Sequence, residues 1–321
     1  MIIGITGATG FIGKALVLEC LKHNHQVRIL TRTRIKDEIS LDNVEVFFGS
    51  LTDYHLDLTS FIDGLDLLYH CAGEIHDLYK MEPLHVSGTK RLLASVQSYF
   101  KRTNCKIHWI QLSSVGVYGP IRGQPSDLRI VTEESYVRPV GIYEETKAVS
   151  DSLVLRAAKN EYLTYTVIRP SNVIGKKMPN KSLYQLGLVI KRGFFFFVGK
   201  HDAVGTYVHV SDLIRLMYIS GYDIRAKNQV FNLSNDCSLV QMVEAMASAL
   251  GVNNPRVRVP EFLVRGCTAL VSKFIKLPVT RERIDALVTR TSYPCSKLIK
   301  ELDFCPEISI PDVIKEIVLV D

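Results

Sequence analysis

The sequence contains 321 residues, of which 47% are hydrophobic and 22% are charged. These proportions are those of an ordinary globular protein, and they exclude a disordered or fibrous chain. The formal net charge of +6 is spread along the chain without a long basic run, so no binding of nucleic acid is expected.

Membrane insertion and metal binding are not expected either. No stretch reaches the roughly 18 uncharged apolar residues that span a bilayer. The most apolar segment of the second half, residues 262–277, is interrupted by basic residues and predicts an amphipathic helix, with contact to a membrane surface as the alternative. The seven cysteines form no C-x-x-C pair, which argues against both a disulfide framework and a zinc site.

The chain opens with an apolar run, residues 1–6, that predicts a buried strand. Three glycines follow it, and a helical pattern begins at residue 11. Gly7 allows a tight turn, Gly10 lets backbone N–H groups approach a pyrophosphate, and Gly13 lets the helix pack closely on the strand. The helix N-terminus favours an anion, so this segment predicts a dinucleotide site. The predicted contacts are Gly7, Thr9, Gly10, Phe11, Ile12 and Gly13.

Through the first half, apolar runs alternate with helical patterns, which is typical of βαβ units in a parallel sheet. The predicted strands are residues 1–6, 26–31, 44–48, 66–71, 106–112 and 163–168. The predicted helices are residues 11–23, 58–63, 81–101 and 141–159. We therefore predict an α/β fold of the Rossmann type, a doubly wound parallel sheet whose ligand lies at the carboxyl ends of the strands.

Beyond residue 170 the alternation loosens into shorter pieces, where we expect a smaller C-terminal α/β substrate lobe. We assign residues 1–170 to a dinucleotide-binding domain, with segments of about 205–235 returning to it. Residues 171–321 then form mainly the substrate-binding lobe. The four consecutive phenylalanines at 194–197 predict a buried strand, with a pocket wall as the alternative.

Arg32 and Arg34 follow the second predicted strand, and no carboxylate accompanies them. An NAD-binding protein of this fold usually has Asp or Glu there for the ribose 2′-OH, whereas an arginine accommodates a 2′-phosphate. We therefore expect NADP(H) to be preferred, with Arg32 as the first choice for the phosphate and Arg34 as the second. Were these arginines only surface charges, NAD(H) would bind as well.

Tyr143 and Lys147 lie four residues apart, on one face of a predicted helix. A nearby positive charge favours the phenolate, so Tyr143 could give or take a proton near neutral pH. The same spacing recurs at Tyr293 and Lys297, as chance allows in a chain with 14 tyrosines. Only Tyr143 is accompanied by a serine motif at a strand end, residues 112–119, so we treat the second pair as accidental.

Six segments together resemble the extended short-chain dehydrogenase/reductase family, which includes nucleotide-sugar epimerases, dehydratases and reductases. They occur in the family's order and cover roughly residues 1–215. The segments are residues 6–13, 70–73, 113–119, 143–147, 169–175 and 207–212. The end of the chain, residues 298–306, is similar to the family's ending.

This resemblance implies roles for individual residues. Ser114 would polarise the substrate carbonyl or alcohol, and Tyr143 would be the general acid/base. Lys147 would hold the nicotinamide ribose and lower the pKa of Tyr143. Asn172 matches a position that often contacts the phosphate or sugar of the substrate. The further cofactor contacts that the resemblance implies are Ser50, Leu51, Cys71, Ala72, Gly73, Tyr143, Lys147, Pro170 and Asn172.

The chain departs from the family at the substrate side. Val115 and Gly116 stand where the 4,6-dehydratases carry acidic residues, so dehydration or decarboxylation by that route is not expected. Of the reactions that the resemblance implies, we therefore expect hydride transfer alone: ketone reduction, alcohol oxidation or 4-epimerisation. Gly205 stands where nucleotide-sugar members commonly have an arginine for the diphosphate, although Arg281 or Arg283 could supply that charge.

Two polar positions depart as well. Ser50 replaces a frequent Asp near the adenine, which should weaken one contact. His85 stands where the family usually has Asn. We expect His85 to hydrogen-bond to neighbouring strands, with a role in proton relay as the alternative.

The leading hypothesis is an NADP(H)-preferring nucleotide-sugar 4-ketoreductase or 4-epimerase that transfers a hydride at a secondary alcohol or ketone carbon. One alternative is a reductase or dehydrogenase of a hydrophobic ketone or hydroxysteroid-like alcohol. The other is a non-catalytic NADP-sensing protein. The resemblance implies a homodimer. A cytoplasmic location is expected because the first residues already form the cofactor strand and leave no room for a signal peptide.

Overall fold

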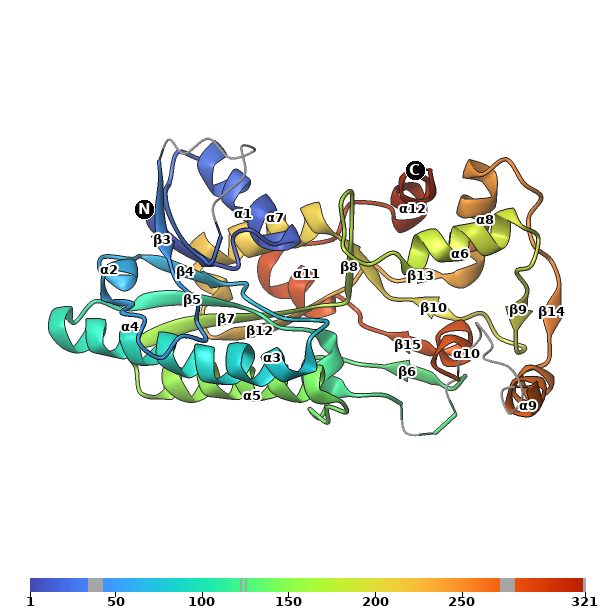
Figure 1. Ribbon diagram of the computed structural model, residues 1–321, viewed down its shortest axis with the longest axis horizontal. Helices are drawn as coiled ribbons and strands as arrows, with labels where there is room; N and C mark the ends of the chain where they lie inside the picture. The colour runs from blue at the N-terminus through green and yellow to red at the C-terminus, as the bar shows by residue number, and fades with distance from the viewer. Residues whose placement is uncertain (34–42, 122, 125, 272–280, 320–321) are drawn as a thin grey trace.

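The computed structural model describes residues 1–33, 43–121, 123–124, 126–271 and 281–319 (Figure 1). Its centre is a seven-stranded parallel sheet in the order β12-β7-β5-β4-β1-β2-β3. The strands are β1 (Ile2–Thr6), β2 (Gln26–Thr31), β3 (Val44–Phe48), β4 (Leu67–His70), β5 (Ile107–Leu112), β7 (Leu163–Pro170) and β12 (Gln229–Leu233). This arrangement confirms the predicted α/β fold of the Rossmann type.

The strand order reverses beside β1, which pairs with β2 on one side and with β4 on the other. In such a sheet, ligands bind in the crevice at the carboxyl ends of the two strands where the order reverses. Gly7 follows β1 directly, and Cys71 follows β4. The predicted dinucleotide turn therefore lies at the crevice.

Helices cover both faces of the sheet, as Figure 1 shows. One face carries α1 (Phe11–Lys22), α7 (Val210–Tyr222) and α11 (Ser296–Leu302), whose apolar side chains share a core with β1. The opposite face carries α2 (Thr59–Ile62), α4 (Thr89–Thr103) and α5 (Ile142–Lys159). Because both faces are covered, the central strands read as continuous apolar runs. Every residue of β5 is buried.

The helix predicted at 81–101 is interrupted. The structure has α3 (Leu78–Glu82), a π-helical turn at Pro83–Gly88, and then α4. Proline lacks the N–H that continues an α-helix, and single π turns occur frequently at functional sites. The turn carries His85, which is buried beside α5.

The smaller lobe is built around α6 (Ser182–Lys191), α8 (Leu239–Ala249) and α12 (Ile310–Val318), which share an apolar core. Four two-stranded sheets connect this lobe with the larger half or lie within it. Their pairs are β8 (Asn172–Ile174) with β11 (Tyr207–His209), β10 (Val204–Gly205) with β13 (Cys237–Ser238), β9 (Phe197–Val198) with β14 (Arg258–Val259), and β6 (Leu128–Ile130) with β15 (Arg290–Ser292). Figure 1 shows α9 (Glu261–Val271) at the far end of the lobe and α10 (Arg281–Val288) nearer to β15.

The structure corrects the strand predicted at 194–197 and describes only part of the helix predicted at 262–277. The strand predicted at 194–197 is wrong for Phe194, whose side chain is 74% exposed, because β9 begins only at Phe197. The helix predicted at 262–277 corresponds to α9 up to Val271, and residues 272–280 lie outside the described part. Among the helices that the structure describes, none is both long and apolar enough to cross a bilayer.

Candidate active site

The carboxyl ends of the central strands open onto one cavity of about 1290 Å³. This volume exceeds the roughly 300–1,000 Å³ of an ordinary small-molecule pocket, so the cavity can hold a dinucleotide together with a second molecule. The predicted site residues that line it are Gly7, Thr9, Gly10, Phe11, Ile12, Gly13, Cys71, Gly73, Ser114, Tyr143, Lys147, Pro170 and Asn172.

The glycine turn has the geometry that its sequence predicts. Gly7 has a φ of +71°, and a Cβ there would lie 2.7 Å from Ala72 N. A Cβ at Gly13 would lie 2.1 Å from the Gly7 carbonyl oxygen, so only glycine lets α1 pack this closely on β1. Gly10 caps α1 without a side-chain hydrogen bond, and the first turn carries no acidic residue. The N–H groups of that turn therefore remain available to a phosphate, and the residues present fit a dinucleotide.

Ser114, Tyr143 and Lys147 reach the cavity from two elements. Ser114 follows β5 and its Oγ accepts a hydrogen bond from Gly116 N at 3.1 Å. Tyr143 and Lys147 lie one helical turn apart on α5. The buried ammonium of Lys147 donates to the Leu112 carbonyl oxygen at 2.9 Å.

The pKa values of this group follow from burial. Burial raises the pKa of Tyr143 to about 12, the charge of Glu144 adds to this, and the Ser114 hydroxyl opposes it. Burial lowers the pKa of Lys147, and Asp151 opposes this. The expectation that Lys147 lowers the pKa of Tyr143 therefore needs correction, because the ammonium is held at the Leu112 carbonyl and burial dominates at the phenol.

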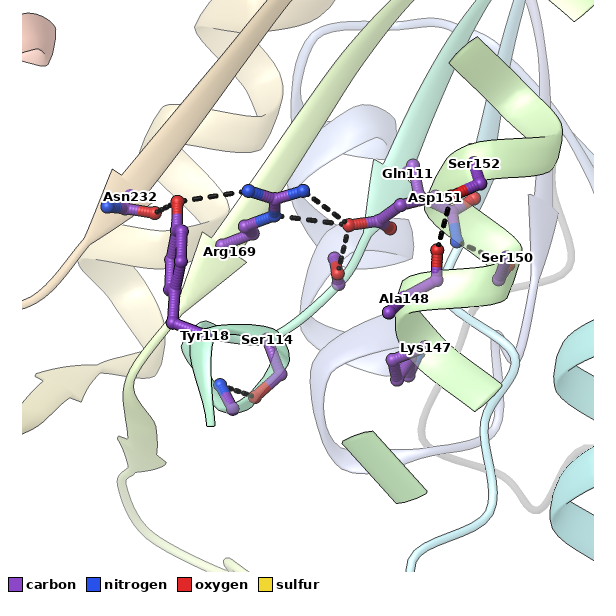
Figure 2. A network of polar contacts seen from close by, with 12 residues as sticks. Gln111, Ser114, Tyr118, Lys147, Ala148, Ser150, Asp151, Ser152, Arg169 and Asn232 are labelled. Carbon is purple, nitrogen blue, oxygen red and sulfur yellow. Dashed lines mark hydrogen bonds and ion pairs between the residues drawn. The ribbon is translucent and has the colours of Figure 1, made fainter. Parts of the chain in front are cut away.

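A buried polar chain holds these elements together, as Figure 2 shows. Asp151 Oδ2 on α5 accepts from Ser113 Oγ at 2.8 Å and from Arg169 Nε on β7 at 3.1 Å. Arg169 Nη1 donates to Tyr118 Oη at 3.0 Å, and that hydroxyl donates to Asn232 Oδ1 on β12 at 2.8 Å. The residue before Ser114 is thus fixed to α5, and α5 is fixed to β7.

Comparison with known proteins decides the family. The model of the NAD dependent epimerase/dehydratase family matches residues 3–234. The chain belongs to this family. The resemblance to extended short-chain dehydrogenases/reductases is confirmed, and the chain is an NAD-dependent oxidoreductase of the epimerase/dehydratase family. It is therefore an enzyme, and we set aside the alternative of a non-catalytic sensor.

Individual relatives of this epimerase/dehydratase-family enzyme differ in the substrates that their names give. Sterol demethylase protein B of Methylococcus capsulatus is 26% identical and covers 92% of this chain and 87% of its own length. A putative UDP-glucose 4-epimerase of Methanocaldococcus jannaschii is 22% identical, and the match covers 71% of this chain and 75% of the relative's length. The solved structure of MoeE5 in complex with UDP-glucuronic acid and NAD matches with a TM-score of 0.74 and 19% identity. The match covers 99% of this chain and 98% of the MoeE5 chain.

Some predicted residues of the family enzyme lie outside the cavity lining. Ala72 packs against the apolar core that α2, α4 and α5 share and donates its N–H to Thr6 Oγ1 at 3.3 Å. The Ser50 hydroxyl bonds to Thr52 Oγ1 at 2.7 Å, and Leu51 is buried. Arg32 is exposed just beyond β2, at the edge where Gly49 N bonds to the Thr31 carbonyl oxygen.

The predicted substrate contacts are brought together only in part. Asn172 lines the cavity, and its Nδ2 donates to the Thr206 carbonyl oxygen at 3.1 Å. Arg283 is exposed on α10 and does not line the cavity. Arg34 and the side chain of Arg281 lie outside the described residues.

His85 bridges a loop and a helix instead of neighbouring strands. Glu74 N donates to its Nε2 at 2.9 Å, so Nδ1 carries the hydrogen and donates to Thr146 Oγ1 on α5 at 2.8 Å. Burial lowers the pKa of His85 to about 3, and the charge of Lys147 adds to this. The ring therefore stays neutral and anchors α5 beside Tyr143.

The cavity lining also includes residues that the sequence did not assign to the site, among them Tyr293 and Glu144. Tyr293 lies in the cavity wall and packs against Tyr118 with ring centroids 6.5 Å apart. Its apparent partner Lys297 instead donates to the Val230 carbonyl oxygen at 3.0 Å. Glu144 also lines the cavity, beside Gly116. Its position directly after Tyr143 was the available signal.

Proposed function

We propose that the enzyme transfers a hydride at a secondary alcohol or ketone carbon, with Tyr143 as the general acid/base. The observation that carries the proposal is that Ser114, Tyr143 and Lys147 line the same cavity as the glycine turn. A hydroxyl pair at the reacting oxygen and a dinucleotide cradle are the parts that this reaction needs.

Each residue has a role in this proposal. Ser114 Oγ holds the reacting oxygen, and Tyr143 gives it a proton during reduction or takes one during oxidation. The raised pKa of Tyr143 suits reduction, because the phenol stays protonated until it donates. Lys147, whose ammonium is held at the Leu112 carbonyl oxygen, keeps two further N–H groups that can donate hydrogen bonds to a ribose.

The glycine turn and the N-terminus of α1 would hold the pyrophosphate of the cofactor. A nicotinamide dinucleotide supplies or accepts the hydride when it is bound. We propose that NADP(H) is preferred and NAD(H) is accepted, with Arg32 at the 2′-phosphate. Support comes from the exposed position of Arg32 at the carboxyl end of β2.

For the substrate, we favour an apolar ring alcohol or ketone of the hydroxysteroid-like kind. The described lining contains no arginine, and its apolar and aromatic members include Val115, Met178, Leu183, Tyr207 and Tyr293. Met242 Sδ would lie 2.3 Å from a Cβ at position 205, so the buried Met242 fills the place of a longer side chain there. Sterol demethylase protein B covers nearly the whole chain, which agrees with this choice.

A nucleotide-sugar 4-ketoreductase or 4-epimerase is the second candidate. Lys176 and Lys177 line the cavity and are cations that could meet a diphosphate. The UDP-glucose 4-epimerase relative agrees with it. The homodimer implied by the family stays a prediction, for which light scattering of the purified protein is the measurement.

The test follows NADPH absorbance with 3-ketosteroids and with 4-keto nucleotide sugars. We expect consumption with the steroids, and at least a roughly 100-fold lower kcat for Tyr143→Phe, because general acid catalysis contributes that much. Tyr136→Phe is the matched control, since Tyr136 is 78% exposed and should leave kcat unchanged.

Consumption with the sugars alone would reject the steroid-like substrate. Turnover undiminished in Tyr143→Phe would reject the proposed acid. Tightly retained NAD(H) in the purified protein, together with sugar interconversion and no net consumption, would favour the epimerase.

A further inference from the structure

Among the described residues, the carboxylate of Glu144 has no hydrogen-bond or ion-pair partner. Its side chain is half-buried in the cavity wall, next to Tyr143 in the sequence. A carboxylate in such a position is free to act on a molecule in the cavity.

Two glycines make room for this side chain. A Cβ at Gly116 would lie 2.9 Å from Glu144 Cγ, and a Cβ at Gly141 would lie 2.7 Å from Glu144 Oε2. The same Cβ position at 116 is 3.3 Å from Ser114 Oγ and 3.7 Å from Glu144 Oε1. The carboxylate and the hydroxyl therefore both lie within 4 Å of the position that a methyl group at residue 116 would occupy.

Glu144 brings to the site a carboxylate that the residues after Ser114 do not supply. Val115 and Gly116 supply no carboxylate after Ser114. The side chain of Glu144, which comes from α5, occupies the space that a residue at 116 leaves open. The site therefore contains a carboxylate in addition to the phenol of Tyr143 and the hydroxyl of Ser114.

We propose that Glu144 is a second acid–base group, which removes and returns a proton at the carbon next to the reacting carbonyl. The ligand is a ketone that carries a C–H bond at that carbon. This inference rests on the proposed function, because it uses the same carbonyl position beside Ser114 and Tyr143.

The step balances without any oxidant or reductant. The C–H bond breaks and its proton forms an O–H bond on Glu144. The electron pair of that bond forms a carbon–carbon double bond, and the carbonyl π pair moves to the oxygen. Ser114 and Tyr143 then donate hydrogen bonds to the enolate oxygen. Return of the proton from Glu144 to the carbon regenerates the ketone.

The test measures proton exchange separately from hydride transfer. The protein is incubated in D₂O with NAD⁺ and with either 5α-androstan-3-one or UDP-4-keto-6-deoxyglucose, and deuterium next to the carbonyl is measured by NMR and mass spectrometry. We expect exchange above the protein-free rate with at least one ketone. Glu144→Gln should slow this exchange by at least about 100-fold, because a general base contributes 10²–10⁴-fold.

Glu145→Gln is the matched control, because Glu145 has the same charge and is exposed on α5. It should exchange at the wild-type rate. Gly116→Ala is a second variant, which displaces Glu144 without changing any charge, and it should also slow the exchange. Thermal melting checks that each variant folds.

Absence of exchange with both ketones would overturn the inference, and so would wild-type exchange in Glu144→Gln. Hydride transfer is followed independently by NADPH absorbance, and proton exchange consumes no cofactor. Failure of the proposed hydride transfer would therefore appear as exchange with neither NADPH consumption nor sugar interconversion, whereas failure of this inference would appear as consumption or interconversion without exchange.

Discussion

At the scale of single residues, function depends on side chains that are held in place by partners far away in the sequence. Ser114 follows a residue whose hydroxyl is tied to Asp151, and Asp151 is tied to Arg169. Burial raises the pKa of Asp151, and the guanidinium of Arg169 opposes this. Breaking such a buried pair by removing one partner is strongly destabilising, because it leaves an uncompensated charge.

The predicted preference for NADPH over NADH depends on Arg32. The exposed Lys80 feels its charge, since Asp77 raises the pKa of Lys80 and Arg32 opposes that shift. We expect Arg32→Ala to lower the ratio of kcat/KM for NADPH to that for NADH by about 10-fold or more, because a charge-assisted phosphate contact is lost.

The matched control for this prediction is Arg192→Ala, which removes an exposed arginine at the end of α6. It should leave the ratio unchanged. An unaltered ratio in Arg32→Ala would show that Arg32 is only a surface charge.

At the scale of elements, α1 packs closely on the turn that follows β1. A Cβ at position 13 would meet backbone atoms of Gly7, which cannot rotate away. We expect Gly13→Ala to lower the free energy of unfolding by about 1–3 kcal/mol, the usual cost of overpacking, and to abolish measurable dinucleotide binding. Urea denaturation and titration calorimetry are the measurements.

Gly266→Ala serves as the control, because no atom lies within 4 Å of a Cβ at this position in α9. It should be neutral or slightly stabilising, since Ala favours the helix more than Gly does. Equal effects of both substitutions would contradict the close-packing argument.

The elements also show what could be predicted from the sequence. Central strands such as β5 were predicted almost to the residue, because burial on both faces produces uninterrupted apolar runs. The break at Pro83 was missed, because the helical periodicity continues on both sides of the π turn. The seventh strand, β12, comes from a segment too short to classify before its partner β7 is known.

The site was predictable wherever its residues lie in one local motif. The glycine turn and the pair Tyr143 and Lys147 are of this kind, and their side chains line one cavity. Glu144 was missed as a cavity residue because its position depends on the missing side chain at Gly116, which belongs to another element. Such a combination exists only after folding.

At the scale of the whole molecule, three buried histidines make stability depend on pH. Burial lowers the pKa of His70 and His85 to about 3 and of His108 to about 4. An unfolded chain protonates these rings below about pH 6.5, whereas the folded chain does not. Stability is therefore full above that pH and is lost as the pH falls, by up to about 1.4 kcal/mol per histidine for each unit.

Urea denaturation at pH 7.5, 6 and 5 tests this prediction. The free energy of unfolding should fall by about 2–4 kcal/mol between pH 6 and pH 5, with the raised pKa of Asp151 acting in the opposite direction. His55→Gln, which changes an exposed histidine, should leave the profile unaltered. Constant stability over this range would contradict the argument.

The seventh strand has a consequence for how the chain can be divided. β12 comes after the first elements of the smaller lobe, yet it is an edge strand of the main sheet. Its Asn232 Oδ1 accepts a hydrogen bond from the Tyr118 hydroxyl. Stopping the polypeptide after residue 170 would remove β12, one of the two neighbours of β7, and leave the buried phenol of Tyr118 without its acceptor. The nucleotide-binding half is therefore not a detachable module, because it is completed by residues translated some sixty positions later.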